Sequence, residues 1–186
     1  LMVSTGVLSS SGFLFWAISA RLFTTEQVGL ATALVSLSLL IANCSLVGYN
    51  NTLIRFLPQS QYHNALLNNG FIVVAAVSVL ISCASISQTH LFSPSLSLIG
   101  SSLQQSTLFV LFSTSSALSL LVESVFVAYR SAKFVLLKNM TTASARLVLP
   151  FFFASWGAFG AFSSASAAMT LSLLFSLYVL ASRFGY

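Results

Sequence analysis

Long apolar stretches alternate with short polar connectors along the whole chain. A helix needs about 20 residues to cross about 30 Å of hydrocarbon, and lipid offers the backbone no hydrogen-bond partner outside the helix itself. By this measure the pattern predicts about six membrane-spanning helices, at about 3–23, 27–48, 65–86, 104–129, 133–156 and 158–182. The predicted fold class is therefore all-α, a polytopic membrane bundle of about six transmembrane helices.

Local signals mark several ends of these helices. Thr24 and Gln27 have the spacing of a capping box at the start of the second helix. Pro58 ends a weaker extension of that helix, and Pro150 predicts a kink in the fifth. The connector at 87–100 follows the third span and has room for a short helix.

The composition indicates that most of the chain lies in a lipid bilayer rather than in water. The chain has 186 residues, of which 57% are hydrophobic and 5% charged, whereas a soluble domain carries about 25% charged residues. The lipid bilayer is therefore an expected partner. The net charge of +5 comes from scattered cations, and without a basic cluster it does not indicate nucleic acid. Cys44 and Cys83 fall inside predicted spans, where we expect buried small apolar side chains rather than a disulfide or metal ligands.

Cations are distributed unevenly between the two sides of the predicted bundle. Connectors after the first, third and fifth spans hold only Arg21, which lies near Glu26. Connectors after the second, fourth and sixth spans hold Arg55, Arg130, Lys133, Lys138 and Arg183. Because Lys and Arg accumulate on the cytoplasmic side, the sequence predicts a multi-pass protein of the cytoplasmic (inner) membrane with a cytoplasmic N-terminus.

One predicted span carries a polar face. Arg146 lies about midway along the fifth span, where an ionised group costs several kcal/mol unless it faces protein or water. Asn139 and Thr142 precede it at helical spacing, so the three side chains share one face, which we interpret as a cavity wall. The many Ser, Thr, Ala and Gly residues of the spans fit either a tightly packed bundle or hydroxyl groups that line a wet cavity.

Glu123 is the other ionisable residue at membrane depth. It precedes the connector between the fourth and fifth spans, and Arg146 follows that connector. Since both are isolated charges of opposite sign, we expect them to form an ion pair. Two alternatives remain open for Glu123: a snorkelling residue at the inner interface, or a titrating site that couples transport to an ion.

The residue inventory disfavours an enzyme. Asp is absent, and neither a phosphate-binding loop nor an HExxH motif occurs. His63 and His90 lie in connectors without companion ligands, so we expect no metal site and no cofactor. Arg21 and Arg55 each have two interpretations: an anchor at the membrane interface, or a cation that turns inward toward an anionic substrate.

Several stretches together carry a resemblance. ARLFTTEQVGLATALVSLSLL is followed by SLVGYNNTLIRFLP, and further along come LVESVFVAYRSAKFVLLKNMTTASARLVLP and WGAFGAF. Their order over nearly the whole chain resembles the polysaccharide-biosynthesis membrane proteins. These are the lipid-linked oligosaccharide flippases of the multidrug/oligosaccharidyl-lipid/polysaccharide exporter superfamily. Such proteins often have an acidic residue, then Ala-x-Arg, an aromatic-aliphatic run and a Gly-x-x-Gly turn.

The resemblance implies a MATE-like fold of two six-helix lobes arranged in a V. Residues 1–186 would form the N-terminal lobe, and we expect the chain to be a fragment that lacks the C-terminal lobe. The implied function is movement of a polyprenyl-pyrophosphate-linked oligosaccharide across the cell membrane by alternating access, as in polysaccharide or lipopolysaccharide biosynthesis. The implied pyrophosphate-binding cations are Arg21, Arg55 and Arg146, and Glu123 stands where Asp is also common.

The implied partners are the lipid-linked oligosaccharide and the glycan polymerase or glycosyltransferases that act on it. Two alternative functions stay open. One is an ion-coupled multidrug exporter of the same fold, although such a protein would favour acidic over basic residues in its cavity. The other is a membrane scaffold subunit that transports nothing.

Overall fold

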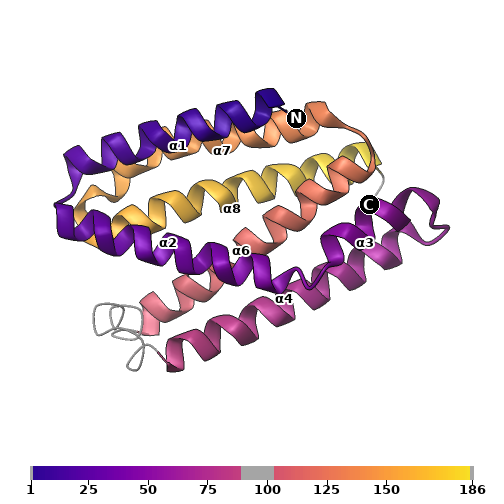
Figure 1. Ribbon diagram of the computed structural model, residues 1–186, viewed down its shortest axis with the longest axis horizontal. Coiled ribbons are helices and arrows are strands. Elements are labelled where there is room, and N and C mark those ends of the chain that lie inside the picture. Colours follow the sequence, from indigo (N-terminus) through magenta and orange to yellow (C-terminus); the bar gives the residue numbers. More distant parts are fainter. Residues whose placement is uncertain (1, 89–102, 185–186) are drawn as a thin grey trace.

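The computed structural model describes residues 2–88 and 103–184. It shows a bundle of long helices (Figure 1). The long helices are α1 (Met2–Leu22), α2 (Thr25–Ser45), α4 (His63–Ser87), α6 (Leu103–Ala128), α7 (Ala132–Phe153) and α8 (Gly157–Phe184). The shorter elements are α3 (Tyr49–Phe56) and the 3-10 turns η1 (Leu57–Gln59) and η3 (Ala154–Trp156). The described residues contain no strand, so the all-α fold class is confirmed. The connector predicted at 87–100 lies, beyond residue 88, outside the described residues.

Four segments of the described chain are long and apolar enough to cross a membrane: Thr25–Ser45, His63–Ser87, Leu103–Ala128 and Ala132–Arg183. The last is 52 residues long and contains both α7 and α8, which fold back along each other (Figure 1). These lengths agree with a membrane-embedded bundle. The division into six spans, and the two-lobed architecture, stay predictions.

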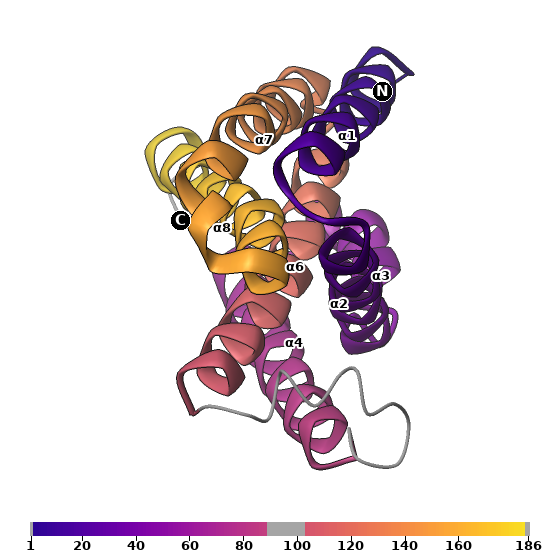
Figure 2. The ribbon, with the colours of Figure 1, turned by 90° about the vertical axis from the view of Figure 1, so that its left-hand side faces the viewer.

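The helices form an elongated bundle with α6 in its middle. Figure 2 shows α1 and α7 side by side at one edge, α4 at the other edge, and α2, α6 and α8 between them. The most extensive helix contacts are those of α7 with α8 and with α1, whereas the consecutive helices α1 and α2 touch little. Helix α1 therefore joins the bundle through α7, which is far from it in sequence.

Both described ends of the chain lie at the same end of the bundle, together with the turn between α6 and α7 (Figure 1). Arg130 lies in that turn, and Lys133 lies at the start of α7. Arg183 lies in the last turn of α8. Lys138 is counted among the connector cations, although the predicted fifth span begins at 133; in the structure it lies inside α7 and is buried.

The start of α2 has the predicted capping box. The backbone N–H of Gln27 donates to Thr24 Oγ1 at 3.4 Å, and the backbone N–H of Thr24 donates to Gln27 Oε1 at 3.1 Å. At its other end α2 does not simply extend to Pro58. Val47 and Gly48 have φ values of 45° and 79°, and this left-handed backbone separates α2 from the short helix α3.

The turn between α7 and α8 depends on two glycines. Gly157 has a φ of 60°, a region that is costly for residues with a Cβ atom. A Cβ atom on Gly160 would clash with the carbonyl oxygen of Phe153. The Gly-x-x-Gly pattern noted in the sequence therefore has a backbone reason.

The largest apolar cluster joins α3, α4, α6 and α8, around Leu53, Leu67 and Phe126. A second cluster packs Phe109 against Phe162, with a centroid distance of 5.8 Å. The expectation that Cys44 and Cys83 are buried is wrong, because both thiols are free and exposed. Only 33% of the apolar window of α2 and 22% of that of α4 is buried, so most apolar positions on these helices face outward.

Candidate functional site

A cavity of about 260 Å³ lies among α1, α2, α6, α7 and α8. Helices α1, α2 and α8 border it mainly with apolar side chains, among them Leu8, Leu39 and Met169. Helices α6 and α7 supply a polar wall made of Glu123, Lys138, Asn139, Thr142 and Arg146. The cavity therefore combines charged groups on one side with apolar residues on the other.

The polar wall follows from the period of α7. Residues 138, 142 and 146 are four apart and so lie one above the other on the same face. The carbonyl oxygen of Lys138 accepts hydrogen bonds from Thr142 Oγ1 and from Ser172 Oγ of α8, both at 3.0 Å. Lys138, Asn139 and Thr142 are each at most 5% exposed. Packing against α8 thus fixes the rotation of α7 that turns this face toward the cavity.

Glu123 forms an ion pair with Lys138 rather than with Arg146. Lys138 Nζ lies 2.8 Å from Glu123 Oε2, and these two side chains form the one ion pair within residues 2–88 and 103–184. The predicted partner was therefore wrong. Glu123 lies seven residues before Arg130 and Lys138 seven residues after Ser131, whereas Arg146 is two helical turns deeper. The α6–α7 turn thus brings Lys138, and not Arg146, to the level of Glu123.

The geometry of that turn is well defined. The backbone N–H of Ser131 donates to the carbonyl of Phe126 at 3.0 Å, and that of Arg130 donates to the carbonyl of Val127 at 2.9 Å. These two bonds form a Schellman motif. Arg130 occupies its left-handed position with a φ of 51°. The motif fixes the register of α6 against α7 and hence the Glu123–Lys138 contact.

Arg146 occupies the deepest charged position of the wall. Its Nε atom is buried and donates to no acceptor among the described residues. A separate small pocket of about 10 Å³ also borders Arg146, together with Ser38, Ser116 and Ser166. A buried donor without a partner is unfavourable by about 1–3 kcal/mol. The Nε atom of Arg146 is consequently a buried donor on the cavity wall that lacks a hydrogen-bond acceptor.

The other two arginines of the predicted site lie elsewhere. Arg21 is in the last turn of α1 and is exposed. Arg55 is exposed on α3, with its Cζ atom 5.4 Å from the centroid of the Phe56 ring. Neither borders the cavity. The structure thus brings Asn139, Thr142 and Arg146 together but leaves Arg21 and Arg55 outside this cavity. Their assignment as pyrophosphate-binding cations or as interface anchors stays a prediction.

Lys138 is the site residue that the sequence analysis missed. It is counted among the connector cations that set the predicted orientation in the membrane. Two signals in the sequence indicate otherwise: it precedes Thr142 by four residues, and it is as far after the turn as Glu123 is before it.

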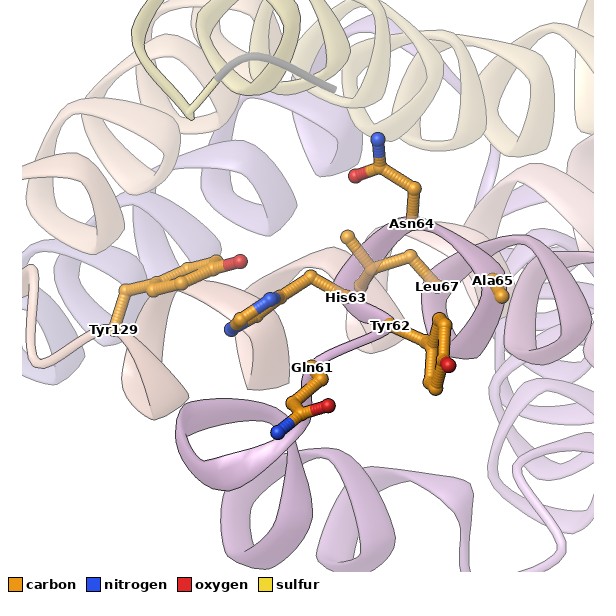
Figure 3. A pocket seen from close by; sticks show the side chains of 7 residues that line it. All are labelled: Gln61, Tyr62, His63, Asn64, Ala65, Leu67 and Tyr129. Atoms are coloured by element: carbon orange, nitrogen blue, oxygen red, sulfur yellow. The ribbon is translucent and has the colours of Figure 1, made fainter.

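A second, wider cavity of about 540 Å³ lies where α4 begins and α6 ends (Figure 3). The rings of His63 and Tyr129 point toward one another there, and burial raises the pKa of Tyr129. Gln61 and Asn64 also border this cavity. The described residues hold no group of three side chains suited to a metal ion, and His90 lies outside them.

No protein-family model, curated protein or solved structure matches this chain. The resemblance to oligosaccharide flippases is therefore carried by the sequence stretches themselves.

Proposed function

We propose that this chain belongs to a membrane flippase that binds the diphosphate of a polyprenyl-linked oligosaccharide in the cavity between α1, α2, α6, α7 and α8. The observation that carries the proposal is the placement of two cations, Lys138 and Arg146, on the wall of one cavity in apolar helices. The resemblance to lipid-linked oligosaccharide flippases supports the same class of substrate.

The two cations suit phosphate oxygens. Arg presents a planar fork of N–H donors that matches phosphate geometry, and Lys adds a compact charge. Such contacts strengthen where bulk water is excluded, because the effective dielectric constant falls. A phosphate oxygen near Arg146 would also supply an acceptor for the buried Nε atom.

The size of the cavity limits which part of the substrate it holds. Sites for drug-sized ligands measure about 300–1,000 Å³, and this cavity measures about 260 Å³. It therefore suits a headgroup, and the glycan and the long prenyl chain remain outside. Leu8 of α1 and Leu39 of α2 border the same space and suit the first prenyl units.

In this proposal the chain supplies one lobe of a two-lobed transporter of the cytoplasmic membrane. Translocation follows the alternating-access scheme, in which two helix bundles rock about a central site. The glycan remains in the aqueous phase on either side, where polymerases and glycosyltransferases act on it. The inner side is the end that carries Arg130, Lys133 and Arg183.

A binding measurement tests the proposal. The full chain in nanodiscs of zwitterionic phosphatidylcholine is titrated with farnesyl pyrophosphate, with farnesol as the uncharged reference. We expect binding of the diphosphate that Arg146→Gln weakens roughly tenfold, the effect of losing a charge-assisted contact in a shielded site. Arg183→Gln removes the same charge from the end of α8 and is the matched control, expected to bind as the wild type does.

Three results would contradict the proposal. The first is equal affinity for farnesyl pyrophosphate and farnesol. The second is binding of the lipophilic cation tetraphenylphosphonium in preference to the diphosphate, which would favour a drug exporter. Absence of binding to all three probes would favour a scaffold subunit.

A further inference from the structure

We propose that Glu123 is a built-in competitor for the anionic headgroup: its carboxylate holds Lys138 until a diphosphate takes its place. This inference rests on the proposed function and adds to it the residue that sets the affinity and selectivity of the site. It starts from the 2.8 Å contact between Lys138 Nζ and Glu123 Oε2 at the cavity wall.

The two members of the pair differ in their freedom to leave it. The side chain of Lys138 is 5% exposed, whereas that of Glu123 is 33% exposed. A buried ammonium without a partner is strongly unfavourable, so Lys138 always needs an anion. Glu123 is already partly exposed at the cavity wall and can turn further into that open space, where its charge is less desolvated. Exchange of Glu123 for a phosphate therefore leaves neither charge buried alone.

Competition of this kind makes the site selective. With Glu123 ionised, the charged groups of the wall are two cations and one anion, so the site retains one net positive charge. An anion with a single negative charge has no more charge than the carboxylate that it must displace, so it gains nothing from the exchange. A diphosphate can replace Glu123 at Lys138 and contact Arg146 as well, so only a ligand with several anionic oxygens gains from the exchange.

Removal of the competing charge tests the inference in the same nanodisc assay. We expect Glu123→Gln to raise the affinity for farnesyl pyrophosphate roughly five- to tenfold, the effect of one partly screened charge at contact distance. We also expect the same variant to bind farnesyl monophosphate more tightly than the wild type does, because a single phosphate has less charge than a diphosphate with which to displace the carboxylate. The matched control is Glu26→Gln, which removes the other acid of the chain from the first turn of α2 and should leave both affinities unchanged.

Each outcome decides between the two proposals. If the wild type binds farnesyl pyrophosphate and Glu123→Gln binds it equally or more weakly, the competition is refuted and the binding function stands. If only Glu123→Gln binds, a diphosphate does not displace the wild-type carboxylate, and both the proposed function and the exchange of partners are refuted. If neither protein binds, both proposals fail.

A second measurement needs no variant at position 123. The chain contains two lysines, Lys133 and Lys138, so lysine labelled with ¹⁵N at Nζ gives two side-chain signals. The signal of Lys138 is assigned by its loss in Lys138→Met. We expect saturating farnesyl pyrophosphate to shift the Lys138 signal and leave that of Lys133 in place. An unmoved Lys138 signal at saturation would refute the exchange of partners.

Discussion

The ion pair between Glu123 and Lys138 should respond unequally to loss of one partner or the other. Lys138→Met keeps a long side chain in the buried position and leaves Glu123, whose side chain is one-third exposed, at the cavity wall. Glu123→Gln instead leaves an ammonium group that is 5% exposed without a counter-charge. Removal of one member of a buried pair costs about 3–5 kcal/mol, and a glutamine that still accepts one hydrogen bond places the cost near 3 kcal/mol.

The exposure of Glu123 reduces the free-energy cost of removing Lys138. Because the Glu123 side chain is one-third exposed, we expect Lys138→Met to lower the free energy of unfolding by about 1 kcal/mol, closer to the behaviour of surface pairs. The double variant should be more stable than Glu123→Gln alone, since replacement of both members of a buried pair by uncharged groups is often neutral. The coupling energy of the cycle should therefore be about 2–3 kcal/mol, within the range for residues in direct contact.

Equilibrium unfolding in mixed micelles with increasing SDS, followed by tryptophan fluorescence, measures these differences. Glu26→Gln is again the control, because Glu26 lies outside the cavity in the first turn of α2. The reasoning is refuted if Lys138→Met destabilises the protein more than Glu123→Gln does, or if the two effects are additive within about 0.5 kcal/mol.

Three further predictions concern the helix turns and the remaining arginines. Gly160→Ala should destabilise the bundle by about 3 kcal/mol, because the new Cβ would clash with the Phe153 carbonyl. Gly12→Ala is the control: nothing lies within 4 Å of its new Cβ, so it should be neutral or stabilising by up to about 1 kcal/mol. Thermal unfolding in detergent compares the two variants. Thr24→Ala removes the acceptor for the Gln27 N–H and should cost about 1 kcal/mol in SDS unfolding; an unchanged midpoint would show that the capping box contributes no stability. Arg21→Gln and Arg55→Gln should each alter the affinity for farnesyl pyrophosphate less than about twofold. Neither side chain borders the cavity, and screened charges at a distance act weakly. A tenfold loss of affinity in the titration would show that these arginines contribute to the binding site.

The sequence alone determined the local structure. Six long helices lie within a few residues of the predicted bounds, because the length and period of an apolar stretch are properties of that stretch. The Thr24–Gln27 capping box formed as predicted, since its atoms are three residues apart. The common face of Asn139, Thr142 and Arg146 likewise follows from the helical period, which needs no knowledge of the rest of the molecule.

Only the tertiary structure decided which charges meet and which faces are covered. The pairing of Glu123 with Lys138 depends on the turn at Arg130 and Ser131, whose left-handed residue is an arginine and gives no glycine signal. Helix α1 packs on α7 rather than on its neighbour in sequence. The exposure of Cys44 and Cys83, and the distance of Arg21 and Arg55 from the cavity, depend on the rotation and neighbours of each helix. The physical reason is that an apolar helix in a membrane protein can turn any face to lipid or to protein, and contacts between distant segments choose between them.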